Sequence, residues 1–289
     1  MNREPVNAYD KRVPAKLAII AGSGVYPGLL AQSATKQGVS YLFAIAFKKE
    51  TDPAIERIVD DVKWLKVGQL DAALSALQES GIRQVVMVGQ ITPIHLFRIR
   101  PDRRMFSLLN HLSAWNAKTI FGGIANELES IGIELLPAYL FMEDAMPLAG
   151  LLTRRKPTEQ EQEDIKLGFK VAKATSGLEI GQTVAVKQGT ILAVEAFEGT
   201  DATILRAGRL GGAGIVVVKV AKEGHDMRFD IPVIGVNTLK SLKKVKAAVL
   251  AVEAKRTILL EREKFVSQAN SMGLCLTIEE LGNNNAGKS

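Results

Sequence analysis

The sequence predicts an α/β protein, with an N-terminal Rossmann-like domain built on a parallel sheet and a C-terminal mixed α/β domain. Short apolar runs alternate with segments that carry apolar residues at helical spacing, as in βα units. The chain has 289 residues, which is enough for two domains of ordinary size. A stretch with prolines and charges near residues 145–157 interrupts the pattern and marks the predicted boundary.

Apolar runs in the first half predict buried parallel strands, because such strands are covered on both faces and show no polar side. The predicted strands are residues 17–21, 41–47, 64–67, 84–91 and 134–139. The helical segments between them end at glycines, among them Gly38 and Gly81. Strands that alternate with helices in this way favour a right-handed, parallel sheet.

The first predicted strand ends in a short glycine turn, formed by Gly22, Ser23 and Gly24, and a helix follows. A strand, a glycine turn and a helix offer backbone N–H groups to an anion, so these three residues are candidates for binding a phosphorylated ligand. The third glycine of the dinucleotide fingerprint is missing. A plain tight turn between strand and helix is the alternative interpretation.

The second half predicts strands and helices in a less regular order. Thr158 and Glu161 form a capping-box pattern for a helix that runs to about residue 175. Gln188 and Gly189 stand between two apolar runs and indicate a β-hairpin. Later strands are predicted at 215–218, 249–252 and 274–278, and helices at 238–245 and 261–271.

These elements predict five parts along the chain. The ends are polar, so we expect a flexible leader and a disordered tail. The parts are a leader at 1–15, the Rossmann-like domain at 16–147, a linker at 148–157, a C-terminal catalytic α/β domain at 158–279 and the tail at 280–289.

The composition limits the classes of function. No run approaches the roughly 18–20 apolar residues that span a bilayer, and no signal-peptide pattern is present. The single cysteine, Cys275, excludes an intramolecular disulfide and, with the missing signal, indicates a cytoplasmic protein. A net charge of +6 favours an anionic partner, either a phosphorylated small molecule or an anionic membrane surface. Few aromatic residues accompany the basic ones, so nucleic acid is not expected.

The candidate catalytic stretch is residues 195–235. Carboxylates, cations and glycines alternate there in segments expected to be turn-rich, and Asp226, Arg228 and Asp230 would share one face if they lay in a strand. Carboxylate oxygens bind Mg²⁺, while lysine and arginine neutralise phosphate oxygens. A set of solvated loop charges is the alternative. The candidate metal ligands are Glu198, Asp201, Asp226 and Asp230. The candidate phosphate-binding residues are Thr153, Arg154, Arg155, Lys219 and Arg228.

Four segments carry a resemblance to a known family. IAGSGVYP at 20–27, LLTRRKPT at 151–158, VEAFEGTDA at 194–202 and DMRFDIPVIG at 226–235 stand in the same order and spacing as in the LpxI family. The chain therefore resembles the UDP-2,3-diacylglucosamine pyrophosphatases, from about residue 16 to 278. It departs from the family after the strand at 84–91, where Gln90 stands in place of a frequent basic residue.

The resemblance implies a phosphoanhydride hydrolase of lipid A biosynthesis that converts UDP-2,3-diacylglucosamine to lipid X and UMP. It implies Mg²⁺, or Mn²⁺, as cofactor, and places the essential aspartate in the last segment, at Asp226 or Asp230, with Asp230 favoured. It adds Thr200 to the candidate substrate-binding residues. The implied partners are a lipid-linked nucleotide sugar and the inner membrane surface, touched peripherally by a cytoplasmic protein, with a homodimer as an expected assembly.

A non-catalytic protein that binds a phosphorylated ligand at the Gly22 to Gly24 turn is the second functional hypothesis, and a nicotinamide dehydrogenase is the third. Metal-dependent release of UMP distinguishes the hydrolase from both.

Overall fold

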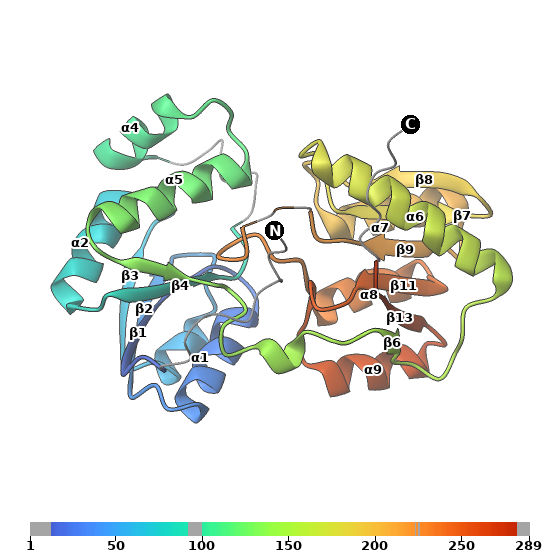
Figure 1. Cartoon of the computed structure of the whole chain (residues 1–289), viewed down its shortest axis with the longest axis horizontal. Coiled ribbons are helices and arrows are strands. Elements are labelled where there is room, and N and C mark those ends of the chain that lie inside the picture. The colour runs from blue at the N-terminus through green and yellow to red at the C-terminus, as the bar shows by residue number, and fades with distance from the viewer. Residues whose placement is uncertain (1–12, 92–99, 223, 225, 282–289) are drawn as a thin grey trace, which may run out of the picture. The chain divides into compact units, whose positions relative to one another are not determined.

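The structure, a computed structural model, describes residues 13–91, 100–222, 224 and 226–281. The predicted leader up to residue 12 and the predicted tail from residue 282 lie outside these residues. The chain divides into two compact units, Met1–Phe141 and Met142–Ser289. Both are α/β, so the predicted fold class is confirmed (Figure 1).

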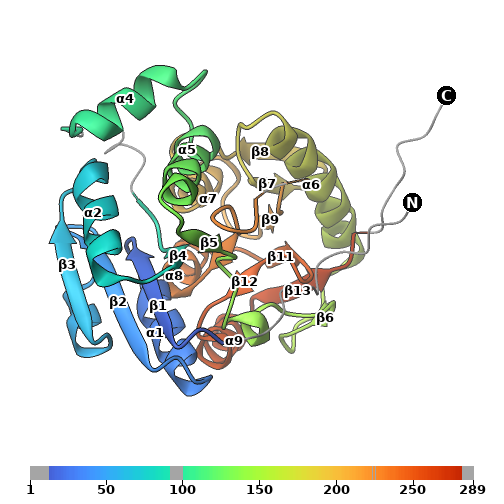
Figure 2. The ribbon, with the colours of Figure 1, turned by 60° about the vertical axis from the view of Figure 1, so that its left-hand side comes forward.

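The first unit is a parallel sheet with helices between its strands. The order of its strands is β3-β2-β1-β4-β5, which Figure 2 shows side by side. Its elements are β1 (Lys16–Ala21), α1 (Tyr26–Lys36), β2 (Tyr41–Phe47), the 3-10 helix η1 (Pro53–Arg57), β3 (Asp61–Leu65), α2 (Leu70–Ser80), β4 (Gln84–Val88), α4 (Arg103–His111), α5 (Ala117–Ser130) and β5 (Glu134–Leu136).

Four strands of this sheet begin at or within one residue of the predicted start, although β4 and β5 are three residues shorter than predicted. The strand predicted at 64–67 is displaced, since β3 is Asp61–Leu65. Leu17, Ala18 and Ile19 of β1 are fully buried, since β1 pairs in parallel with β2 on one side and β4 on the other. Each large apolar side chain buried in this way contributes about 1.5–3 kcal/mol. The helix α2 ends, as predicted, at Gly81, which adopts the left-handed conformation with φ of 68°.

The second unit is a mixed sheet with a short two-stranded sheet of β10 and β12 beside it. The strand order of the larger sheet is β6-β13-β11-β9-β7-β8. The elements are the 3-10 helix η2 (Glu143–Ala145), β6 (Gly150–Leu151), α6 (Glu159–Gly177), β7 (Thr183–Lys187), β8 (Thr190–Val194), α7 (Thr200–Gly211), β9 (Val216–Lys219), β10 (Val233–Ile234), α8 (Val236–Lys244), β11 (Val249–Glu253), β12 (Ile258–Leu259), α9 (Arg262–Ser271) and β13 (Cys275–Glu279).

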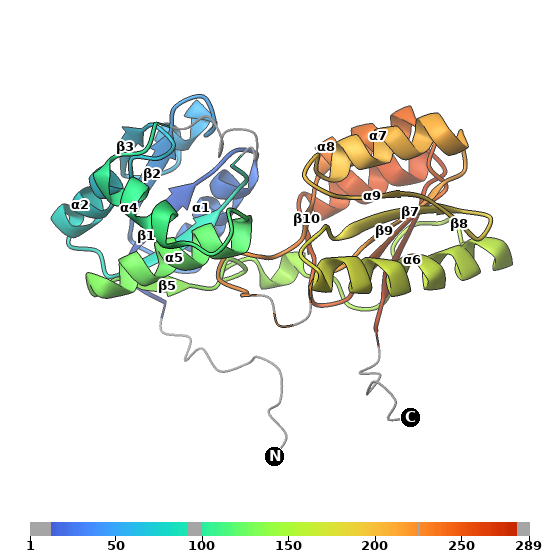
Figure 3. The same ribbon diagram turned by 90° about the horizontal axis from the view of Figure 1, so that it is seen from above.

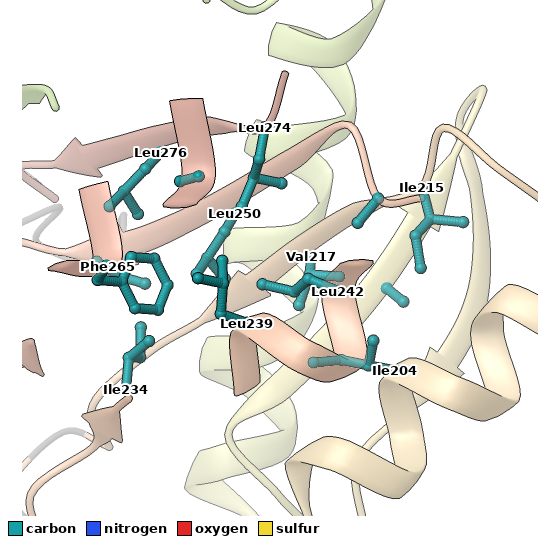
Figure 4. Packing of buried hydrophobic residues seen from close by; sticks show 14 of the residues in the cluster. Ile204, Ile215, Val217, Ile234, Leu239, Leu242, Leu250, Phe265, Leu274 and Leu276 are labelled. Atoms are coloured by element: carbon teal, nitrogen blue, oxygen red, sulfur yellow. The ribbon is translucent and has the colours of Figure 1, made fainter. Parts of the chain in front are cut away.

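Helices cover both faces of the larger sheet, with α7, α8 and α9 on one face and α6 on the other (Figure 3). Figure 4 shows the first of these cores, where Ile204, Leu242 and Phe265 from the three helices pack onto the sheet. The second core joins Phe169 of α6 to β9 and β11 through Val218 and neighbouring side chains. A sheet with two apolar faces explains why its central strands carry no alternation of polar residues.

Two local signals of the second half are confirmed. The capping box forms at the start of α6, where Thr158 and Glu161 exchange side-chain and backbone hydrogen bonds. The hairpin turn between β7 and β8 has φ of 48° at Gln188 and 73° at Gly189. The carboxylate of the buried Asp164 in α6 accepts both N–H groups of this turn, at 2.8 and 2.7 Å. This contact was not predictable from the sequence, because 24 residues separate Asp164 from Gln188.

The predicted linker at 148–157 contains β6, which pairs antiparallel with β13 and so belongs to the sheet of the second unit. Among the helices of the residues described, none combines the length and the apolar character needed to cross a bilayer.

Cys275 is fully buried at the start of β13, and this burial raises the pKa of its thiol to about 11. The thiolate is the reactive form, so at pH 8 the folded chain should hold about a hundredfold less of it than a free thiol of pKa 9.0. We expect iodoacetamide to alkylate the native protein at least about a hundredfold more slowly than the protein in urea. Equal rates, followed by mass spectrometry, would show that Cys275 is accessible.

Candidate functional site

Several candidate residues of the second unit lie at one edge of its sheet. The strands β9, β11 and β13 are parallel, so their carboxyl ends lie at the same edge. The antiparallel strand β7 begins at this edge, where Thr183 is the register partner of Lys219. The segment that follows β8 returns here, since the N–H of Glu195 donates to the carbonyl of Thr183 at 2.8 Å. We call this the carboxyl edge.

Lys219 is the central cation of the carboxyl edge. It is the last residue of β9 and only 8% exposed, and its Nζ donates to Thr200 Oγ1 at 2.8 Å. No carboxylate of the described residues forms an ion pair with it. Buried lysines are nearly always paired, because an isolated buried charge is costly. An ammonium group with one neutral acceptor and further N–H donors is suited to bind an anionic oxygen.

The start of α7 supplies the acceptor for Lys219. Thr200 is the first residue of α7, and its hydroxyl donates to Glu195 Oε1 at 2.9 Å. Asp201 follows in the first turn, where a carboxylate is favourable to the helix dipole. Its Oδ1 is buried and, among the residues described, has no hydrogen-bond partner.

The segment from Asp226 to Asp230 is a turn and not a strand, so the condition under which its three charges would share one face is not met. The N–H of Asp230 donates to the carbonyl of Asp226 at 2.8 Å, which folds the segment back on itself. Within the turn the Asp226 carboxylate binds Arg228 through Nε at 3.0 Å and Nη2 at 2.8 Å. The local pairing of Asp226 with Arg228 replaces the alternation of a strand.

Asp230 differs from Asp226 in its surroundings. Its Oδ1 accepts from Gln182 Nε2 at 3.1 Å, and no cation of the described residues pairs with its carboxylate. Gln182 precedes β7, and its carbonyl accepts the N–H of Val220 at 3.0 Å, directly after Lys219. Asp230 is therefore attached to the carboxyl edge, near the residues around Lys219.

Glu198 is exposed and pairs with a cation of its own. Arg206 Nη2 donates to Glu198 Oε1 at 2.5 Å. Burial alone would raise the pKa of Glu198, but the hydrogen bond and charge of Arg206 outweigh it and hold the pKa below its usual value.

The four candidate metal ligands do not form a preformed metal site. Among the described residues, no group of three or more histidine, cysteine, aspartate or glutamate side chains could hold a metal ion. Glu198 and Asp226 are neutralised by arginines, whereas Asp201 and Asp230 keep a carboxylate oxygen without a cation.

The Gly22 to Gly24 turn of the first unit uses two of its N–H groups internally. Gly22 N donates to Val88 O at 2.8 Å and Ser23 N to Gln90 O at 2.7 Å. A Cβ at Gly22 would lie 2.6 Å from Gln90 O, so glycine is required for this close approach. These contacts support the plain-turn interpretation for Gly22 and Ser23. They leave Gly24 beside an open pocket of about 690 Å³, together with Lys48, Lys49 and Trp64.

Thr153, Arg154 and Arg155 are not brought to the carboxyl edge. The Thr153 hydroxyl accepts Leu276 N at 2.8 Å, and Arg154 N donates to Asn270. Arg155 Nη1 donates to Ala248 O at 3.1 Å, just before β11 begins, and its Nη2 binds Glu161 at 2.6 Å. Arg155 thus lies at the opposite, amino end of the parallel strands.

Sequence reasoning missed several residues of the carboxyl edge. The side chain of Gln182 forms a hydrogen bond with Asp230, and that of Thr183 forms one with Thr200. Glu253 is a buried carboxylate that binds Lys173 at 2.7 Å. Glu253 was detectable as a charged residue that ends an apolar strand. Gln182 and Thr183 show no such signal, because their partners lie 48 and 17 residues away.

The fold is that of an α/β protein of two compact units, with a cluster of polar side chains around Lys219 at the carboxyl edge of the C-terminal sheet. The LpxI N-terminal domain matches residues 16–145, and the LpxI C-terminal domain matches residues 148–277. The chain belongs to the LpxI family.

One relative is the UDP-2,3-diacylglucosamine pyrophosphatase LpxI of Caulobacter vibrioides. It is 29% identical over 271 residues, which cover 90% of this chain and 95% of the relative.

Similarity to solved structures is weak. The biotin carboxylase domain of Hydrogenobacter thermophilus 2-oxoglutarate carboxylase is 12% identical with a TM-score of 0.26, over 80% of this chain and 40% of the other. The biotin carboxylase subunit of a pyruvate carboxylase is also 12% identical with a TM-score of 0.26, over 68% of this chain and 41% of the other. Scores at this level carry no inference about this chain.

Proposed function

We propose that the chain hydrolyses the pyrophosphate bond of UDP-2,3-diacylglucosamine in lipid A biosynthesis and releases UMP and 2,3-diacylglucosamine 1-phosphate, which is lipid X. The observation that carries the proposal is the match of both domains to the LpxI family, with a relative of that named activity aligned over 90% of the chain. The carboxyl edge supports it, since a buried lysine that pairs with no carboxylate of the described residues suits a phosphorylated ligand.

The proposed reaction is attack by water on the β-phosphorus, on the sugar side of the diphosphate. A new P–O bond forms as the bond to the bridging oxygen breaks, and UMP leaves with that oxygen. Such transfers depend on neutralised phosphate charge and an oriented nucleophile, with little covalent chemistry by the protein. Lys219 and Arg228 supply positive charge, while the Asp230 carboxylate orients the water and accepts its proton.

Divalent-metal dependence is a separate part of the proposal. Bound Mg²⁺ or Mn²⁺ would neutralise charge on the diphosphate. Asp201 and Asp230 are the residues that could hold it, because each keeps a carboxylate oxygen without a cation among the described residues. We expect turnover to fall at least about tenfold in excess EDTA and to return with either metal. Full turnover in EDTA would remove the metal from the proposal and leave the hydrolysis intact.

The proposed substrate carries acyl chains, so we also propose peripheral contact with the inner membrane surface from the cytoplasmic side, and a homodimer as the assembly. The positive net charge of +6 supports attraction to anionic lipid.

Hydrolysis in ¹⁸O-labelled water tests the reaction and the atom attacked. The purified chain with UDP-2,3-diacylglucosamine and Mg²⁺ should release UMP, detected by liquid chromatography. Mass spectrometry should place the label in lipid X and not in UMP. Label in UMP would overturn attack at the β-phosphorus. Binding without UMP release would favour the alternative, a non-catalytic protein that binds phosphorylated ligands.

A further inference from the structure

We propose that Glu195 is a positioning residue, which fixes the ammonium group of Lys219 through the hydroxyl of Thr200. The inference rests on the proposed function and names a residue that the phosphate and metal assignments above do not include. It follows from the number of hydrogen bonds that one hydroxyl group can make.

The Thr200 hydroxyl has three polar neighbours at hydrogen-bond distance. They are Glu195 Oε1 at 2.9 Å, Lys219 Nζ at 2.8 Å and Thr183 Oγ1 at 3.3 Å. A hydroxyl group has one proton to donate and two lone pairs that accept. The one donor site and both acceptor sites of the Thr200 hydroxyl are therefore occupied.

The charges decide the direction of each bond. A carboxylate can only accept, so the Thr200 proton points to Glu195. An ammonium group can only donate, so Lys219 occupies one lone pair. Thr183 must then donate to the other lone pair. With Glu195 in place, the hydroxyl presents a lone pair to Lys219 and has no alternative arrangement.

Backbone contacts hold Glu195 where this arrangement needs it. Its N–H donates to the carbonyl of Thr183 at 2.8 Å. Gly181 lies so close that a Cβ there would stand 2.1 Å from the carbonyl oxygen of Glu195. The loop before β7 and the segment after β8 are thus packed backbone to backbone, which fixes the backbone of Glu195 beside Thr183.

The position is unfavourable for stability. The second carboxylate oxygen, Glu195 Oε2, is buried and has no hydrogen-bond partner among the described residues. A buried, unsatisfied charged oxygen is costly. A residue kept for stability alone would not carry this cost, whereas a residue that directs Lys219 gains its benefit in the reaction.

Glu195→Gln separates the two roles. Glutamine keeps the volume but also offers N–H donors, so the hydroxyl of Thr200 can turn away and Lys219 loses its single orientation. We expect kcat to fall about tenfold to a hundredfold, the range for a lost hydrogen bond to a charged group. KM should change less than kcat, because a directed ammonium group acts mainly on the charge that develops on the leaving-group oxygen in the transition state. The melting temperature should stay equal or rise. Glu163→Gln is the control, because the Glu163 carboxylate is exposed and pairs with Lys166. This variant should leave kcat and the melting temperature unchanged.

A double-mutant cycle tests whether Glu195 acts through Thr200. Thr200→Val removes the hydroxyl, and Glu195→Gln in that background should cause no further loss of kcat. Thr200→Ser keeps the hydroxyl and should stay within about threefold of the wild type. The proposal would be overturned if the losses of kcat from the two single variants multiplied in the double variant. It would also be overturned if Glu195→Gln left kcat unchanged or lowered the melting temperature. A wild-type chain that releases no UMP would overturn the proposed function as well, so the two failures are distinguishable.

Discussion

Asp230→Asn is expected to lower kcat for UMP release by at least about a hundredfold, the low end for losing a general base. Asparagine has nearly the same volume, and its Oδ1 can still accept the bond from Gln182 Nε2 that fixes the native side chain. The turn therefore stays in place while the negative charge is lost. Because that charge is needed when the water gives up its proton, the loss should appear in kcat and not in substrate binding.

Asp226→Asn is the comparison for this prediction. The Asp226 carboxylate is already engaged by two nitrogen atoms of Arg228, so it is poorly placed to take a proton from water. We expect a smaller loss of kcat than for Asp230→Asn, with the dissociation constant of the substrate measured for both variants. A larger loss for Asp226→Asn would make Asp226 the catalytic aspartate. Normal turnover in both variants would place the site elsewhere.

The central strands were predictable from the sequence because they are buried on both faces, whereas the edge strand β3 alternates exposed and half-buried residues and was predicted with shifted bounds. The run 41–47, for example, has no polar residue and became β2 with the predicted bounds. Helix ends were predictable where a single residue type determines them, as at Gly81 and at the capping box of α6. Such signals are local, and no distant part of the chain has to be known to interpret them.

The helix α7 was missed, and with it the position of Thr200. Residues 195–214 were expected to be turn-rich because glycines and charges are frequent there. The signal that could have revealed the helix is the spacing of Thr203, Ile204 and Ala207, which are the buried residues of α7. The strand expected around Arg228 failed for a related reason: charges two residues apart can also pair within a turn, as Asp226 and Arg228 do.

The candidate site was only partly predictable. Lys219 and Asp230 could be selected as charged residues at the ends of apolar segments. Their hydrogen-bond partners could not, because Thr200 and Gln182 reach them across 19 and 48 residues of chain and are common polar residues. Arg155 shows the opposite error. The segment 153–155 suggested phosphate binding, but in the fold the Arg155 guanidinium binds the carbonyl of Ala248 and the carboxylate of Glu161.

Lys219→Met should lower kcat/KM by about a hundredfold to a thousandfold, the loss found when one group that stabilises transition-state charge is removed. Methionine keeps the length of the apolar stem inside the sheet but has no ammonium group. The melting temperature should stay equal or rise, because the lysine is 8% exposed and no carboxylate of the described residues pairs with it.

Lys187→Met is the matched control for Lys219→Met. Lys187 ends β7, and its Nζ donates to the carbonyls of Gly211 and Ala213 at 2.6 and 2.8 Å. Its loss leaves those carbonyl groups without a donor, so we expect a lower melting temperature and an unchanged kcat/KM for UMP release. The two lysines should therefore show opposite patterns in activity and in thermal unfolding. If Lys219→Met loses stability and keeps its activity, Lys219 is a structural residue and the phosphate is bound by other groups.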